Sequence, residues 1–101
     1  MEQAVIAHLI PDVGDDWGVD LVEDPLIEAI EEAGVGEFDG NLLGPGEVEL
    51  YAYGPDADVL FEAMEPILRA VPLKAGSYAI KRYGAADDPG AREVRVELSS
   101  A

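Results

Sequence analysis

Two runs of alternating apolar and polar residues flank a Gly-Pro-Gly tripeptide at residues 44–46. Phe38 and Leu42 occupy apolar positions of the first run, and Val48 and Leu50 occupy those of the second. A period of two is typical of strands that bury one face, and glycine and proline between two such runs favour a tight turn. The sequence therefore predicts a β-hairpin. A phosphate-binding glycine loop is not expected here, because such loops join a strand to a helix N-terminus.

A helical spacing of apolar residues precedes the hairpin. Leucine and isoleucine recur at helical intervals over residues 24–33, which predicts an amphipathic helix. Asp24 is its expected N-cap, Pro25 its first helical residue, and Gly34 the residue that ends it. The preceding residues 11–23 are expected to form an acidic loop.

A second helix is expected after the hairpin, over residues 55–70. Asp56 and Asp58 fall in its first turn, where carboxylates interact favourably with the helix dipole. Pro66 lies well inside this segment and has no amide hydrogen to donate. The sequence therefore predicts a kink or an early end of the helix at this point.

Three further strands complete the pattern, at residues 3–10, 76–84 and 93–98. The first of them is apolar on both faces, which is typical of a central strand. Right-handed crossovers then lead from the element order to one arrangement. We expect an α+β fold, namely a ferredoxin-like βαββαβ sandwich with an added C-terminal strand, in which an antiparallel sheet carries two helices on one face. A chain of 101 residues makes one such domain, residues 1–101.

Charge is distributed unevenly along the chain. The formal net charge is -16, and all six basic residues lie at or after Arg69, so the first 68 residues carry 18 acids and no base. Such a field repels phosphate, which disfavours binding to nucleic acid and to anionic membranes. It favours a protein partner with a basic surface. The alternative interpretation is an acidic surface that serves solubility alone.

The residue types that several kinds of catalysis require are missing from the chain. It has no cysteine and a single histidine, His8, so thiolate sites and paired-histidine metal sites are excluded. No nucleophile and base stand in a known motif. We therefore expect a binding module rather than an enzyme, with no cofactor and no metal. The first residues lack Lys and Arg and no apolar run approaches the length of a membrane span, which predicts a cytoplasmic protein.

A distinctive pattern runs from residue 36 to residue 84, and reads GEFDGN, then YGPDAD, then LRA, then RYG. This pattern resembles that of a set of small uncharacterised bacterial proteins. The resemblance covers roughly the last two thirds of the chain and implies a stand-alone domain. It implies no chemistry, because no activity or catalytic residue is assigned to that set.

The sheet face away from the helices is the best candidate for a ligand site. If Val5, Ala7 and Leu9 face the helices, His8 points to the open face beside the tyrosines of the neighbouring strand. Stacking of bases on such tyrosines is opposed by the charge. The opposite orientation of the first strand would make His8 a core residue. The candidate ligand-binding residues are His8, Asp39, Glu49, Tyr51, Tyr53, Lys81 and Tyr83.

An acidic cluster precedes the first helix, with Asp12, Asp15, Asp16 and Asp20 within nine residues. Clustered carboxylates suit hard cations, but the spacing lacks the EF-hand pattern and its distal glutamate. A solvated acidic loop is the interpretation that the spacing favours.

Two functions of different classes follow. The first is a small acidic interaction module that binds a basic protein surface as an inhibitor or regulator, because negative fields steer association with basic partners. Its candidate partner-binding residues are Glu37, Asp39, Glu47 and Glu49. The alternative is a small-molecule-binding or catalytic domain that uses the open face around His8 and Tyr51.

The last predicted strand is expected at a sheet edge, where an unpaired strand invites strand addition. Its alternating Glu93, Arg95 and Glu97 can complement a second copy across a two-fold axis. We predict a weak homodimer, which light scattering at high protein concentration checks. A monomer under those conditions would contradict the prediction.

Overall fold

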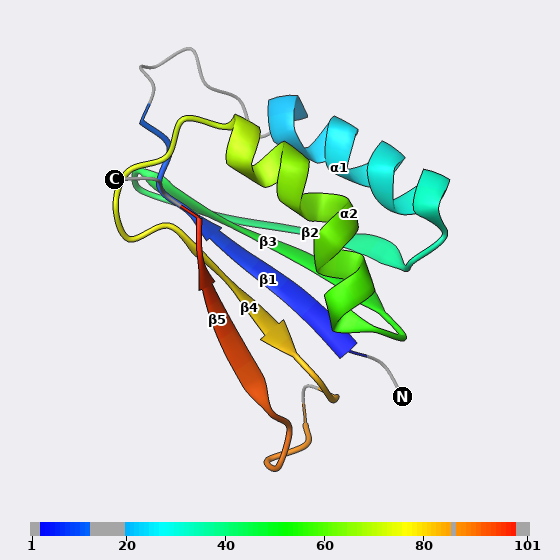
Figure 1. Cartoon of the computed structure of the whole chain (residues 1–101). Coiled ribbons are helices and arrows are strands. Elements are labelled where there is room, and N and C mark those ends of the chain that lie inside the picture. Colours follow the sequence, from blue (N-terminus) through cyan, green and yellow to red (C-terminus); the bar gives the residue numbers. More distant parts are fainter. Residues whose placement is uncertain (1–2, 13–19, 86, 99–101) are drawn as a thin grey trace.

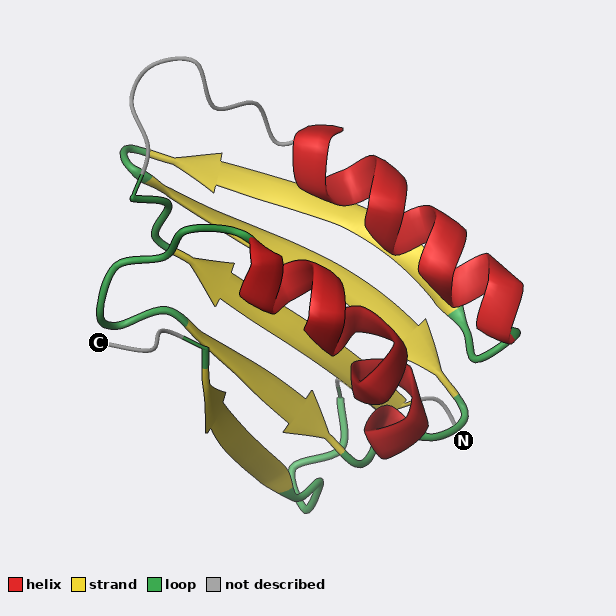
Figure 2. Ribbon diagram, turned by 45° about the horizontal axis from the view of Figure 1, so that its top comes forward, coloured by secondary structure: helices red, strands yellow, loops and turns green. Residues whose placement is uncertain are grey.

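The structure is a computed structural model that describes residues 3–12, 20–85 and 87–98. These residues form a five-stranded antiparallel sheet with two helices on one of its faces (Figures 1 and 2). The prediction of an α+β fold with an antiparallel sheet is confirmed. We call the sheet face that the helices leave uncovered the open face.

The elements follow the predicted order. They are β1 Gln3–Leu9, α1 Asp20–Ala33, β2 Glu37–Gly44, β3 Glu47–Gly54, α2 Ala57–Ala70, β4 Tyr78–Arg82 and β5 Glu93–Glu97. The strands lie side by side in the order β2-β3-β1-β4-β5. The first strand is therefore central, between β3 and β4, as its apolar composition predicts. β5 lies at one edge of the sheet and β2 at the other (Figure 1).

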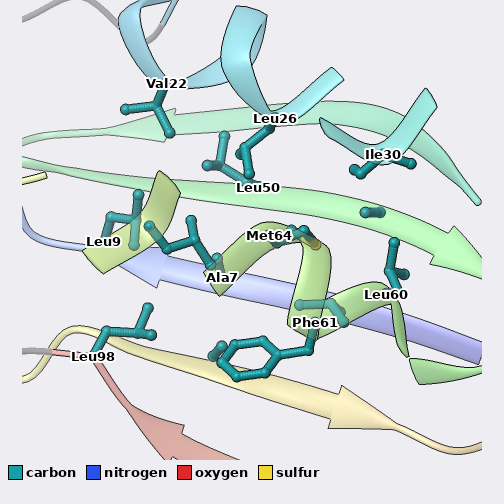
Figure 3. Packing of buried hydrophobic residues seen from close by; sticks show 14 of the residues in the cluster. Ala7, Leu9, Val22, Leu26, Ile30, Leu50, Leu60, Phe61, Met64 and Leu98 are labelled. Atoms are coloured by element: carbon teal, nitrogen blue, oxygen red, sulfur yellow. The ribbon is translucent and has the colours of Figure 1, made fainter. Parts of the chain in front are cut away.

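The core lies between the sheet and the two helices (Figure 3). Alternate residues of β1 and β3 supply its floor, and the apolar stripes of α1 and α2 supply its roof. The largest fully buried side chains are Leu9, Leu26, Ile30, Leu50, Leu60, Met64, Leu68, Val5, Val22 and Val48, together with Ser77. Burial of apolar area on this scale is the main force that holds the sheet and helices together.

The start of α1 differs from the prediction. The helix begins at Asp20, so Asp24 is not its N-cap and Pro25 lies inside it. Val22, Leu26 and Ile30 are spaced by four residues and are all buried, so the apolar stripe starts a turn earlier than expected. The predicted loop is therefore wrong over residues 20–23, while its residues 13–19 lie outside the described part.

The other helix ends agree better with local signals. Gly34 has φ 64 and its amide donates to the Ile30 carbonyl at 3.0 Å, which confirms it as the residue that ends α1. The Asp56 carboxylate caps α2 by accepting from the amide of Asp58 at 2.9 Å. Pro66 lies within α2, which continues to Ala70, so the predicted early end is wrong. The side chain of Pro66 is exposed and leaves the buried stripe of α2 intact.

The hairpin forms as predicted, with Pro45 and Gly46 as its two-residue loop. Gly46 has φ 73, a left-handed conformation that glycine adopts without a steric penalty. The alternation in β2 is interrupted by a β-bulge between Phe38 and Gly40. Phe38 packs against the core, whereas Leu42 lies opposite Glu49 on the open face. The expectation that both apolar side chains share the buried face is therefore wrong.

Two glycines allow a close backbone contact between the start of β2 and the end of β3. A Cβ on Gly54 would overlap the carbonyl oxygen of Val35, and one on Gly36 would overlap that of Tyr53. No side chain larger than hydrogen fits at either position without a backbone shift. This contact holds the start of β2 against the end of β3.

Gly54→Ala is expected to lower the free energy of unfolding by about 2 kcal/mol, because the new methyl group must displace backbone. Gly44→Ala is the matched control in the same hairpin, since its Cβ would meet nothing closer than the Glu47 side chain at 3.4 Å. The control is expected to change stability by less than about 0.5 kcal/mol. Urea unfolding measures the free energy of unfolding of both variants. Equal losses of stability would contradict the close backbone contact at Gly54.

Candidate functional site

The orientation of β1 decides which residues reach the open face. Val5, Ala7 and Leu9 belong to the core, so His8 points to the opposite side. Its cross-strand neighbours are Glu49 on β3 and Tyr78 on β4. Tyr51 and Tyr53 alternate with buried residues of β3 and lie on the same face as Glu49. The placement predicted for His8 and these three β3 residues is confirmed.

His8 is held between an aromatic ring and two carboxylates. Its ring stacks on Tyr78 with centroids 5.1 Å apart and an interplanar angle of 17°. Its Nε2 lies 3.2 Å from Glu47 Oε2, and its Nδ1 lies 4.0 Å from Glu49 Oε1. The His8 side chain is 18% exposed, so solvent still reaches the group. Glu47 is the closer carboxylate, whereas the 4.0 Å distance to Glu49 is too long for a hydrogen bond.

A hydrogen bond extends this group along β3. The Tyr51 hydroxyl donates to Glu49 Oε2 at 2.7 Å. That hydrogen bond, with smaller contributions from burial and from the charge of Glu49, raises the pKa of Tyr51 above its ordinary value. The phenol therefore stays neutral and acts as a donor at physiological pH, rather than as a base.

The structure places Lys81 and Tyr83 on the helix side, so their predicted position on the open face is wrong. Lys81 pairs with Val5 in the sheet and shares its face. Its Nζ lies 3.0 Å from Asp58 Oδ1 of α2 and 5.5 Å from the centroid of the Phe61 ring. The Tyr83 hydroxyl donates to the same Asp58 oxygen.

Tyr78 takes the open-face position on β4, and sequence reasoning missed it. Arg95 of β5 lies over the Tyr78 ring, with its guanidinium carbon 3.9 Å from the centroid, and its Nε contacts Glu97 Oε1 at 3.1 Å. The signal that could have found Tyr78 is parity, because it alternates with the buried Ala79. The signal is weak, because the alternative face of this segment, with Lys81 and Tyr83, is also polar.

The four predicted partner-binding acids all lie on the β2–β3 hairpin, but they do not form one cluster. Glu47 and Glu49 come together beside His8. Glu37 pairs with Tyr53 at the opposite end of the hairpin. Asp39 is exposed in the bulge, where the register provides it with no cross-strand partner. The hairpin therefore carries acids along its length rather than at one point.

Ion pairs are concentrated on one side of the domain. Those between a basic residue and an acid join Glu65 to Arg69 at 2.8 Å, Asp58 to Lys81 at 3.0 Å and Glu97 to Arg95 at 3.1 Å. All three involve α2, β4 or β5. The acids of α1 and β2 whose side chains the structure describes have no such partner. The exposed acids of these two elements are Asp24, Glu28, Glu31, Glu32, Glu37 and Asp39.

The described residues give less support to a metal site, to a pocket at the candidate site or to a membrane-spanning helix. No group of three His, Asp or Glu side chains in this part of the chain is arranged to hold a metal ion. The candidate residues Asp15 and Asp16 lie outside it. A hollow of about 330 Å³ is lined by residues at the end of α2 and by Asp12 and Leu98, away from His8. No described helix has the length and apolar character needed to cross a membrane.

Comparisons of the chain with protein-family models, with curated proteins and with solved structures found no match. The resemblance to small bacterial proteins stays a prediction.

Asp58 links α2 to β4, and its ionisation is expected to make stability depend on pH. The hydrogen bond from Tyr83, followed by that from Lys81, holds the pKa of Asp58 below its ordinary value of 3.8. Because the folded value is the lower one, the ionised carboxylate stabilises the fold above about pH 3.8, and this contribution is lost as the pH falls through the folded value. Asp58→Asn is expected to lower stability at pH 7, with the difference from wild type shrinking towards pH 3.

Urea unfolding at pH 7, 5 and 3 measures this difference. Glu62→Gln is the control, because it removes an exposed charge from the same helix that has no ion pair among the described residues. A deficit of Asp58→Asn that is as large at pH 3 as at pH 7 would show that charge is not the cause.

Proposed function

We propose that this protein is a small acidic interaction module that binds a protein with a basic surface through the side formed by α1 and the β2–β3 hairpin. Binding of this kind would inhibit or regulate the partner by covering its basic surface. The observation that carries the proposal is the separation of charge. Three ion pairs neutralise Asp58 and Glu65 of α2 and Glu97 of β5, whereas the exposed acids of α1 and β2 have no Lys or Arg partner among the described residues.

The separation of paired from unpaired acids matters because the electrostatic fields of neighbouring charges add. Several uncompensated carboxylates on neighbouring elements produce a potential that draws a basic protein to one side and raises the association rate. The same field repels nucleic acids and anionic membrane surfaces. Asp58 and Glu97 contribute much less to this field, because each lies within 4 Å of a cation.

The proposal includes the fold class. We assign the domain to the ferredoxin-like βαββαβ sandwiches with β5 as an added strand. The assignment rests on the two βαβ-like halves, on the order β2-β3-β1-β4 and on the antiparallel pairing of β1 with both neighbours. In such a sandwich the hairpin reaches one edge of the sheet, and its open face is free for contact.

A second candidate function is the binding of a small molecule on the open face. It is favoured by the contacts of His8 with Glu47 and Tyr78 and by the hydrogen bond between Tyr51 and Glu49. These groups are held by one another and present a donor, an acceptor and an aromatic ring together. A ligand with a cationic or aromatic group would suit them. The two candidates differ in what a single substitution does, because a field depends on many acids and a site on few.

Cytochrome c, a folded protein with a basic surface, is a suitable probe. The wild-type protein is expected to bind it with an affinity that falls steeply as salt is added. Glu37→Gln combined with Glu47→Gln is expected to weaken binding about fivefold at low salt. The matched control, Asp87→Asn combined with Glu93→Gln, removes the same charge from the β4–β5 side and is expected to change affinity less than about twofold.

Titration calorimetry at several salt concentrations measures these affinities. Equal weakening by the two double variants would mean that net charge alone matters, which contradicts a binding side on α1 and the hairpin. His8→Ala should leave the affinity within about twofold. Loss of binding in that variant, with the fold intact, would favour the open-face site instead.

A further inference from the structure

The edge strand β2 offers backbone groups that no described residue pairs. β2 is the last strand of the sheet on its side and has β3 as its one neighbour among the described strands. α1 packs beside β2 (Figure 2), and no described strand pairs with the outer edge of β2. An edge of this kind presents a row of N–H and C=O groups that can pair with another strand.

The exposed apolar side chains lie on the same segment. The large hydrophobic residues exposed in the described part are Leu42 at 60%, Leu43 at 61% and Val59 at 42%. The two leucines are adjacent in β2, so they point to opposite faces of the sheet. Leu42 lies opposite Glu49 on the open face and Leu43 opposite Val48 on the helix side. Apolar side chains are therefore available to an added strand on both of its faces.

The two parts of β2 differ in how they resist association. The part before the bulge carries Glu37 and Asp39, and a bulge with charges is a common protection of sheet edges. The part after the bulge, Asn41–Gly44, has no charged residue. It is the part that holds both exposed leucines, so this half of the strand is suited to pairing.

The charges around this segment decide what kind of strand fits. Glu49 lies opposite Leu42 and Glu47 lies opposite Gly44. On the helix side, the Asn41 amide donates to the Glu23 carboxylate of α1. An incoming strand is therefore next to Glu23 on the helix side, while Glu47 and Glu49 lie one strand further in on the open face, beside His8. A second copy paired here would bring its own acids to the same place, whereas a basic segment would be attracted.

The other edge of the sheet is less suited to a basic partner. β5 alternates Glu93, Arg95 and Glu97 on the open face, and Arg95 already contacts Glu97 and the ring of Tyr78. None of its residues is an exposed large hydrophobic. Charges on an edge strand hinder the addition of strands that do not match them.

We propose that Asn41–Gly44 of β2 binds an extended segment of the basic partner as an additional strand of the sheet. Apolar residues of that segment pack on Leu42 and Leu43. A Lys or Arg side chain on the helix side lies near Glu23, and long basic side chains on the open face extend across β2 towards Glu47 and Glu49 of β3. The inference rests on the proposed function, since it names the way in which the basic partner binds. Backbone hydrogen bonds provide affinity in this mode, and side chains select the sequence.

An eight-residue peptide with the repeat Lys-Lys-Val-Val is the probe, because this order puts both lysine and valine on each face of a strand. Its control has the same sequence with the four central amides N-methylated, which keeps every charge and side chain but removes strand hydrogen bonds. The methylated peptide is expected to bind about tenfold more weakly. Binding of the parent peptide should also slow hydrogen exchange at the amides of residues 41–44. Equal affinity of the two peptides, or no binding of either, would overturn the strand addition.

Variants of the protein give an independent test. Leu42→Ser combined with Leu43→Ser is expected to weaken peptide binding about tenfold, because the apolar contacts are lost. Both side chains are largely exposed, so the fold should persist. Val59→Ser is the control, since it removes an exposed apolar side chain from α2 instead. Unchanged binding in the leucine variant would overturn the inference.

The two proposals can fail separately. If cytochrome c binds on the acidic side but N-methylation and the leucine substitutions have no effect, the acidic module stands and the strand addition is wrong. If cytochrome c does not bind and the lysine-valine peptide does so with the expected dependence on Leu42 and Leu43, the edge is a peptide site and the broader acidic surface is not the binding side.

Discussion

The central strand β1 pairs on both of its sides, and this double pairing orients the whole sheet. β1 pairs antiparallel with β3 through Val5 and Ala52 and with β4 through Val5 and Lys81. Because strand residues alternate, the burial of Val5, Ala7 and Leu9 under the helices sets the face of every residue on both neighbours. The position of His8 on the open face, and of Lys81 beneath α2, follows from this single orientation.

Three of the basic residues form ion pairs within the C-terminal part of the fold that contains them. They occur at or after Arg69, and the strands and helix end formed there contain the ion pairs between acids and Lys or Arg. The acids of α1 and β2 come earlier in the chain and lie at the other side of the domain (Figure 1). A gradient of charge along the sequence thus becomes a gradient of charge across the molecule, because β2 and β5 occupy opposite edges of the sheet. This relation links the amino-acid composition to the proposed binding side.

The β2–β3 hairpin combines a rigid attachment with an open edge. At one end, Gly36 and Gly54 allow the two backbone segments to approach more closely than any side chain would permit. After the bulge, the strand presents Leu42 and Leu43 to solvent rather than to the core. A hydrophobic edge would be a hazard in most proteins. In the proposed strand addition, the neighbouring carboxylates would favour a segment of opposite charge, which is the basis for proposing a specific rather than an indiscriminate contact.

Local sequence signals are sufficient to predict the element order, the turn at Pro45 and Gly46, and the end of α1 at Gly34. Each follows from a local requirement, such as a positive φ or an apolar period. The tertiary structure alone decided the bulge in β2, the earlier start of α1 and the faces taken by Tyr78, Lys81 and Tyr83. In β4 both alternations are partly polar, so their local patterns are nearly equivalent. Pairing with β1 selects one of them, because Ala79 then faces the core and Lys81 reaches Asp58 of α2.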